Sequence, residues 1–210
     1  MNAIVLHTNV FSPYGWTARL VAAEKGVPCE VAAVDVTSPA HLKLHPFGKM
    51  PVLQHGDIIV YETAAITHYI DRAFAGPALQ PVDVLGQTQV LRWISVVNSY
   101  VFPVMNRLIK ERAAGSWRPQ PPDEAAIDQL RAPLAQQLRL IDETVASHAF
   151  VVGDRLTIAD CFLFPHLHFA AFTPEGAEAL KRAPAARRWL ERMRARPSFE
   201  STNPLAATAS

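Results

Sequence analysis

The stretch His45-Pro-Phe-Gly-Lys-Met-Pro-Val-Leu-Gln-His-Gly-Asp-Ile-Ile-Val-Tyr-Glu-Thr63 decides how this chain folds. Its pattern predicts two short strands, 52–53 and 58–61, joined by a turn at Gly56-Asp57. The apolar-periodic run that follows predicts a helix over 63–73. Strand, turn, strand and helix thus follow one another without a break.

Two features of this stretch suggest a binding site. Met50 precedes Pro51, and a cis bond between them would turn the Met50 main-chain groups away from the sheet, toward an extended ligand. Thr63 is expected at a helix N-cap, where free N–H groups, the hydroxyl and the helix dipole attract a carboxylate. Both features fit a peptide-like ligand that carries a carboxylate.

The composition excludes several classes of protein. Half of the 210 residues are hydrophobic, 19% are charged and the net charge is +1, so neither nucleic acid nor an acidic membrane is an expected partner. The first residues lack the basic and apolar regions of a signal peptide, and no run is long enough to span a membrane. With only Cys29 and Cys161, a disulfide framework is excluded, and a reduced, cytoplasmic protein is expected.

The first part of the chain alternates between strands and helices. The pattern predicts a strand over 3–7, a helix over 16–25 capped by Gly26, a strand over 29–36 and a short helical turn over 39–44. Together with the opening stretch, these elements form a thioredoxin-like α/β layout over residues 1–75.

A linker over 76–85 separates this layout from residues 86–210, which read as entirely helical. We expect a long buried helix over 87–113 that is kinked at Pro103. A single apolar stripe marks a second helix over 123–145, and an amphipathic helix is expected over 185–196. Between them, Thr157 to Asp160 form a capping box, and the neighbouring Cys161 is expected to be structural.

These motifs together resemble the cytosolic glutathione transferases over nearly the whole chain. The resemblance rests on Pro46-Phe-Gly-Lys-Met-Pro-Val-Leu53, on Glu62-Thr63 and on Gly153-Asp-Arg-Leu-Thr-Ile-Ala-Asp160. It implies that glutathione is the co-substrate, with its cysteinyl backbone on Met50 beside Pro51 and its γ-glutamyl end at Glu62 and Thr63. It also implies a homodimer, formed by the faces 64–70 and 87–97, that needs no metal or redox cofactor.

Ser12 is the candidate catalytic residue. The loop Ser12-Pro-Tyr-Gly15 looks like a glutaredoxin redox motif in which both cysteines are replaced, so the loop offers no thiol for disulfide exchange. A hydroxyl at a helix N-terminus can instead donate a hydrogen bond to a bound thiolate. Trp16 and Arg19 resemble the zeta-like subgroup, whereas Pro46-Phe-Gly48 and Glu62 are closer to the phi- and theta-like ones, so the class stays open.

Other candidates have a structural alternative beside the functional one. Lys49 and His41 could reach the glycyl carboxylate of glutathione, or could be ordinary turn and helix residues. Thr8 and Tyr14 are alternative hydroxyls to Ser12. The pocket for a small hydrophobic electrophile is expected to involve Tyr14, Tyr100, Met105 and Asn106. The pairs His41/His45 and His166/His168 lack a third ligand, so no metal site is expected.

The most probable activity is therefore conjugation of glutathione to an apolar electrophile through Ser12. A zeta-like glutathione-dependent isomerase is one alternative, suggested by Trp16 and Arg19. A second is a transferase fold that serves only as an interaction module, against which the intact Ser12, Pro51 and Glu62-Thr63 set argues. Peroxidase or thiol-transferase activity is a third, disfavoured by the serine.

Overall fold

The computed structural model describes residues 3–113 and 120–206. The chain forms two compact units: unit 1 contains the residues up to Pro81 together with those from Arg194 onward, and unit 2 runs from Val82 to Met193. Unit 1 is the thioredoxin-like α/β layout, and the described residues of unit 2 form helices joined by turns and loops, without a strand. The fold class inferred from the sequence is confirmed, while the last residues of the chain return to unit 1 rather than staying with the helices.

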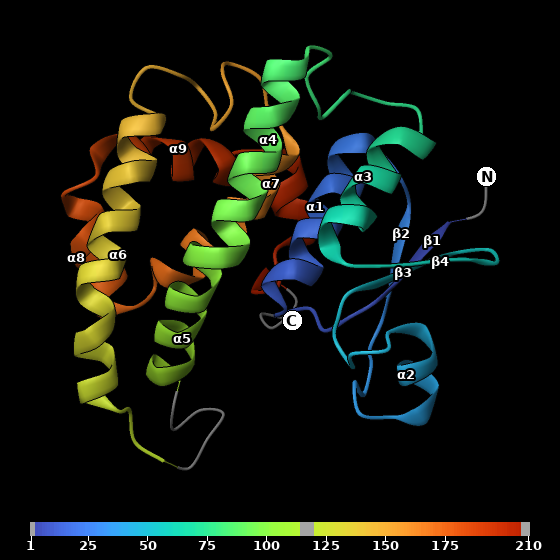
Figure 1. The fold of residues 1–210 in the computed structure, drawn as a ribbon, viewed down its shortest axis with the longest axis horizontal. Coiled ribbons are helices and arrows are strands. Elements are labelled where there is room, and N and C mark those ends of the chain that lie inside the picture. Colours follow the sequence, from blue (N-terminus) through green and yellow to red (C-terminus); the bar gives the residue numbers. More distant parts are fainter. Residues whose placement is uncertain (1–2, 114–119, 207–210) are drawn as a thin grey trace. The chain divides into compact units, whose positions relative to one another are not determined.

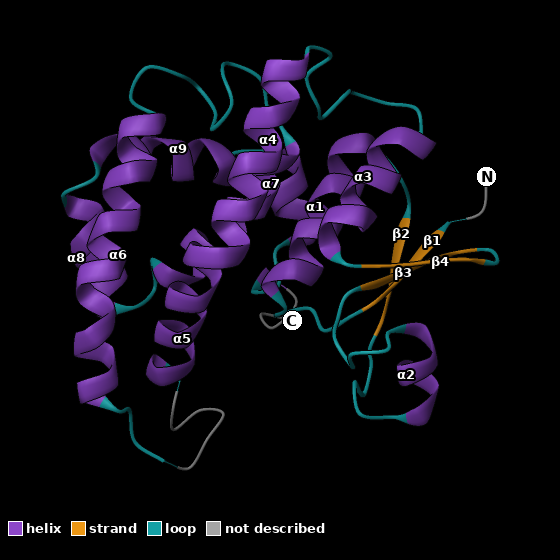
Figure 2. Ribbon diagram, viewed as in Figure 1, coloured by secondary structure: helices purple, strands orange, loops and turns teal. Residues whose placement is uncertain are grey.

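Unit 1 is built on a four-stranded sheet with the order β2-β1-β3-β4 (Figure 2). Strand β1 (Ile4–His7) runs parallel to β2 (Cys29–Ala32) and antiparallel to β3 (Val52–His55), which pairs in turn with β4 (Ile58–Tyr61). Strand β2 ends at Ala32 rather than at residue 36, because its partner β1 contributes only four residues to the ladder. The Gly56-Asp57 turn is confirmed between β3 and β4.

Helices α1 (Pro13–Lys25) and α3 (Thr63–Ala73) lie side by side against the sheet, while α2 (Pro39–Leu44) lies away from them (Figure 1). Leu6, Leu20 and Ile66 are almost wholly buried between these layers. Helix α1 starts three residues earlier than its apolar pattern indicated, because Pro13 is well suited to a first helical turn.

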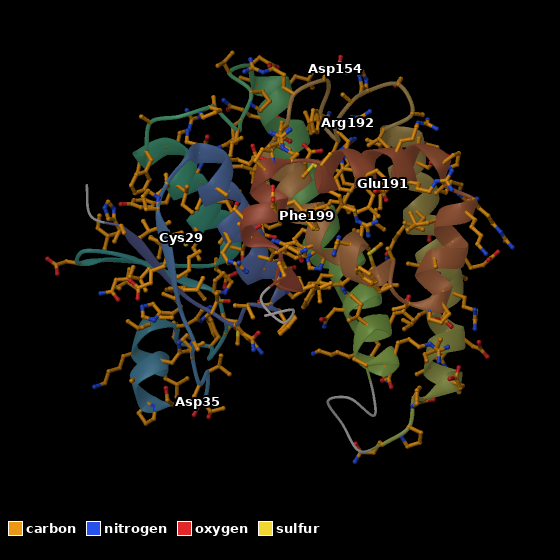
Figure 3. The ribbon with its side chains drawn as sticks, turned by 180° about the vertical axis from the view of Figure 1, so that it is seen from behind. Cys29, Asp35, Asp154, Glu191, Arg192 and Phe199 are labelled. Carbon is orange, nitrogen blue, oxygen red and sulfur yellow. The ribbon has the colours of Figure 1, made fainter. Side chains whose placement is uncertain are left out.

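The C-terminal helix α10 (Pro197–Thr202) packs against α1 within unit 1. The indole N–H of Trp16 donates to the Thr202 hydroxyl at 2.8 Å, and the ring of Trp16 lies 6.1 Å from that of Phe199, the α10 residue labelled in Figure 3. The Glu24 carboxylate accepts hydrogen bonds from the Arg196 guanidinium and the Ser198 hydroxyl. Residues 196–202 therefore clamp the helix whose N-terminus carries Ser12.

Unit 2 begins with α4 (Val84–Val96), a π-helical turn (Val97–Val101) and α5 (Phe102–Arg112). The expected single long helix is thus present but interrupted just before Pro103. A proline lacks the N–H that continues the ladder and crowds the carbonyl four residues earlier, so the irregularity falls in the preceding turn. The expectation that this helix is largely buried is wrong for its first half, since Val84, Leu85 and Leu91 are 80%, 69% and 61% exposed.

The rest of unit 2 comprises α6 (Glu124–Thr144), α7 (Ile158–Ala170), α8 (Pro174–Lys181) and α9 (Pro184–Arg194). The predicted stripe of α6 is buried at Ile127, Leu134, Leu138, Ile141 and, just beyond the helix, Val145. Asp142, off this stripe, accepts hydrogen bonds from the N–H groups of Ala185 and Ala186 and so caps α9. Helix α9 ends at Arg194, ahead of Pro197.

The capping box of α7 is confirmed, with Thr157 and Asp160 hydrogen-bonded to each other's main and side chains. Asp160 also accepts hydrogen bonds from the Val151 N–H and from the Trp189 indole, so this buried carboxylate joins three segments of unit 2. Cys161 is fully buried, as its structural assignment predicted. In the described part of the chain, no helix is both long enough and apolar enough to cross a membrane.

Candidate functional site

Ser12 is the N-cap residue of α1. Its Oγ accepts a hydrogen bond from the Gly15 N–H at 3.1 Å, and its C=O accepts the Trp16 N–H at 2.8 Å. The side chain is half-buried, and its hydroxyl hydrogen has no acceptor among the residues that the structure describes. Ser12 can therefore donate to a ligand at the positive end of the α1 dipole.

Of the two alternative hydroxyls, Thr8 is unsuited to this role because it is buried, whereas Tyr14 remains a possible donor. Thr8 is fully buried beneath α1, where a Cβ atom added to Gly15 would lie 2.1 Å from its Oγ1. Burial raises the pKa of Tyr14 far above its usual value, and the charge of Glu62 raises it further. Tyr14 thus stays a neutral phenol, able to donate a hydrogen bond but not to act as a base.

The Met50–Pro51 peptide bond is cis, as predicted. Among the described residues, the Met50 N–H and C=O have no main-chain partner, although β3 begins two residues later at Val52. The Met50 sulfur lies 3.3 Å from the N–H of Asn9, in the turn that leads into Ser12. This places an unpaired main-chain edge close to the start of α1, where an extended peptide could pair with it.

Lys49 and His41 lie beside this edge. The His41 Nε2–H donates to the Lys49 C=O at 2.7 Å, and the ring is 4% exposed, with Nδ1 buried and without a hydrogen-bond partner. The Lys49 side chain is exposed. His41 thus already holds the main chain of the segment, whereas the Lys49 ammonium remains free to meet a carboxylate in solution.

Helix α3 begins at Thr63, as predicted, but its N-cap lies one residue earlier than expected. Glu62, not Thr63, is the N-cap residue, with a left-handed φ of 69° and no side-chain capping bond, so the N-cap assignment of Thr63 is wrong. Thr63 is the first helical residue and is 8% exposed. A non-glycine residue at positive φ costs energy and is typical of functional sites. Because no side chain caps α3, its first N–H groups are available to an anion.

Asn9 connects these parts and was missed by sequence reasoning. Its C=O accepts the Ser12 N–H and its N–H faces the Met50 sulfur, while the charge of Glu62 acts on Tyr14. The start of α1, the cis-proline edge and the start of α3 are therefore neighbours in unit 1. A loop asparagine carries no signal that would have singled it out.

The three pocket candidates of unit 2 differ in exposure. Tyr100, in the π-helical turn, is 64% exposed, and its C=O accepts a hydrogen bond from the Gln137 amide. Asn106 is half-buried, but Met105 is fully buried in the core of unit 2. Only Tyr100 and Asn106 have surface available for a ligand. Within residues 3–113 and 120–206, no group of three His, Cys, Asp or Glu side chains could hold a metal ion.

Comparisons with known proteins match both units. Residues 6–78 match the family described as "Glutathione S-transferase, N-terminal domain", and residues 124–192 match "Glutathione S-transferase, C-terminal domain". Glutathione S-transferase 3 of Zea mays is 29% identical over 96% of this chain and 94% of its own length. A probable glutathione S-transferase of Oryza sativa subsp. japonica is 30% identical over 86% of each chain.

Solved structures agree with these sequence matches. The structure of glutathione S-transferase III in its apo form has a TM-score of 0.85 and 28% identity, and the match covers 96% of this chain and 95% of that one. A glutathione transferase from Populus trichocarpa has a TM-score of 0.87 over 95% of this chain and 97% of its own, at 24% identity, which shows the fold alone.

Proposed function

Since this chain belongs to the glutathione S-transferase family, we propose that it joins the glutathione thiolate to an electrophilic carbon of a small, largely apolar substrate. The observation that carries the proposal is the Ser12 hydroxyl, which is held at the N-cap of α1 with its hydrogen uncommitted. In this reaction a carbon–sulfur bond forms, the leaving group departs with its electron pair, or the electrons move into an acceptor double bond, and the thiol proton passes to solvent.

Residues of unit 1 would bind glutathione along its length. The Met50 main chain would pair with the cysteinyl residue, and the free N–H groups of α3, at Thr63, would hold the γ-glutamyl carboxylate. The Glu62 carboxylate suits the γ-glutamyl ammonium group. Lys49 is free to meet the glycyl carboxylate, and His41 contributes by fixing the Lys49 carbonyl.

Ser12 would then stabilise the thiolate. Lowering the thiol pKa by about two units requires roughly 2.7 kcal/mol of preferential stabilisation of the thiolate. A charge-assisted hydrogen bond together with the dipole of α1 can supply this amount. Holding both substrates in one geometry adds a contribution from proximity. In unit 2, the exposed Tyr100 and the half-buried Asn106 are retained as contacts for the electrophile, whereas the buried Met105 is not.

The cysteines favour conjugation over thiol exchange. Cys161 is fully buried, and burial raises the pKa of Cys29 to about 11, so neither supplies a thiolate at neutral pH. The relatives from maize and rice carry the transferase name, which favours conjugation over the isomerase and the interaction module.

A homodimer is the expected assembly. The exposed apolar side chains of Val84, Leu85 and Leu91 give α4 a surface that a second copy would cover, in continuity with the expected 87–97 face. The face 64–70 of α3 is the second expected contact. Cys29 and Cys161 form no disulfide in the described part of the chain, which fits the cytoplasm as the compartment.

The test compares Ser12→Ala with the wild type by ultraviolet difference absorbance of bound glutathione thiolate as a function of pH. Removing the hydroxyl should return the thiol pKa toward the free value, a rise of about one to two units that lowers kcat/KM at neutral pH by roughly 10- to 100-fold. Thr173→Ala is a matched control, because Thr173 caps α8 by accepting the Gly176 N–H at 3.0 Å, the same arrangement as Ser12 and Gly15.

The control should lose stability but keep the thiol pKa of the wild type. An unchanged pKa in Ser12→Ala would exclude Ser12 as the activating group and leave main-chain N–H groups or Tyr14. Absence of glutathione binding in the wild type would instead favour the interaction module.

A further inference from the structure

Two buried histidines hold the loop between α2 and β3. His41 and His45 are 4% and 2% exposed. The Nε2–H of His41 donates to the Lys49 C=O, whereas Nδ1 of His45 accepts the N–H of Phe47 at 3.3 Å. A carbonyl only accepts and an N–H only donates, so His41 bonds through a protonated Nε2, whereas His45 bonds through an unprotonated Nδ1.

This difference decides which ring responds to acid. Protonation of His41 keeps the Nε2 donor and its bond to Lys49. Protonation of His45 removes the acceptor that holds Phe47 and sets two N–H groups against each other. His45 also sets the turn through its main chain, because its C=O accepts the Gly48 N–H at 2.9 Å. His45 therefore holds the turn from residue 45 to Gly48, the residue before Lys49.

The surroundings of His45 keep its ring neutral near pH 7. Burial, the largest effect, lowers its pKa from the usual 6.5, and the nearby charges of His41 and Lys49 lower it further, while Glu62 opposes them. The ring of Tyr61, from β4, packs against it with centroids 4.9 Å apart. Among the described residues, the negative charge that acts on the His45 ring is that of Glu62, at the start of α3.

We propose that His45 is a positioning residue that makes glutathione affinity fall in mild acid, because its neutral ring holds the 45–48 turn and with it the Met50 main chain. This inference rests on the proposed function, in which Met50 pairs with glutathione. Protonation releases Phe47 and loosens the segment, so KM for glutathione rises while kcat at saturation changes less.

The test measures the Kd of S-methylglutathione, which has no thiol proton to lose, by isothermal titration calorimetry between pH 5.0 and 7.5 for the wild type, His45→Asn, His45→Leu and His148→Asn. In this range the carboxylates of this ligand stay ionised, and the ionisation of the glutathione thiol that Ser12 would promote does not enter the measurement. The wild-type Kd should rise about threefold or more toward pH 5, and by less than the tenfold per pH unit that linkage to one protonation allows. His45→Asn should bind with a Kd that hardly changes with pH, because an asparagine oxygen accepts an N–H two residues on and does not titrate.

The other two variants bound the interpretation. His45→Leu lacks any acceptor and should bind weakly at every pH, while His148→Asn, on an exposed site in unit 2, should follow the wild type. If the wild-type Kd does not change with pH, or if the Kd of His45→Asn changes with pH as much as that of the wild type, this inference is wrong while the proposed function stands. Absence of glutathione binding at pH 7.5 overturns the proposed function and, with it, this inference.

Discussion

Replacing Gly15 by alanine sets two physical effects against each other. Gly15 is inside α1, where alanine is the better helix former by about 1 kcal/mol. The new Cβ, however, would lie 2.1 Å from Thr8 Oγ1 and 3.1 Å from both Thr8 Cβ and Cγ2. Thr8 is fully buried and cannot move aside freely, so overpacking should cost roughly 1–3 kcal/mol. We expect the clash to prevail, with a net loss of about 1 kcal/mol.

A double-mutant cycle isolates the contact. Thr8→Ala removes the nearest atom, so Gly15→Ala should be less damaging in that background, with a coupling of at least about 1 kcal/mol. Urea unfolding followed by far-ultraviolet circular dichroism measures it, since 1 kcal/mol shifts the midpoint by roughly 0.3–1 M. The displaced helix start should also raise the bound thiol pKa, because the Gly15 N–H holds Ser12. A Gly15→Ala protein as stable as the wild type, with additive effects in the cycle, would refute the close-contact argument.

Two further predictions concern ion pairs. Burial opposes the ionisation of Glu24, but hydrogen bonds from Arg196 and Ser198 and the Arg196 charge together hold its pKa below 4.5. The stability that the ionised Glu24 contributes is therefore present above that pH and is lost in stronger acid. Glu24→Gln should lower the unfolding free energy by about 1–2 kcal/mol at pH 7, and urea titrations should show a smaller loss at pH 3.5 than at pH 7. Glu175→Ala should lower the unfolding free energy by roughly 3 kcal/mol in the same assay, because the Glu175 side chain is only 4% exposed and pairs with Arg112. Glu124 pairs with the same arginine but is 62% exposed, so Glu124→Ala should cost under about 1 kcal/mol. Equal losses would contradict the role given to burial.

Local signals accounted for much of the fold. The Gly56-Asp57 turn, the helix from Thr63 to Ala73 and the Gly26 cap each depend on residues within one or two turns, and the structure has them where the sequence placed them. The cis bond before Pro51 was also anticipated, since only proline makes that geometry accessible.

Features set by contacts far apart in the chain could not be read this way. Glu62, at positive φ, takes the N-cap position of α3 that the sequence assigned to Thr63, and no propensity marks a glutamate for positive φ. The bond of His41 to the Lys49 carbonyl depends on how α2 folds back over the loop. From the sequence, the exposed apolar face of α4 looks like part of the hydrophobic core. Hydrophobicity alone does not distinguish a face buried within the chain from one that another molecule covers.

The clamp formed by residues 196–202 has a consequence for how the protein is made. Helix α1 leaves the ribosome early, but Arg196 and Thr202, which bind its Glu24 and Trp16, are synthesised only after all of unit 2. At the usual pace of translation this delay is on the order of ten seconds. The nascent thioredoxin-like unit therefore cannot complete the packing of α1 until α10 has been synthesised. Premature termination within unit 2 would release a chain in which α1 lacks its contacts with α10.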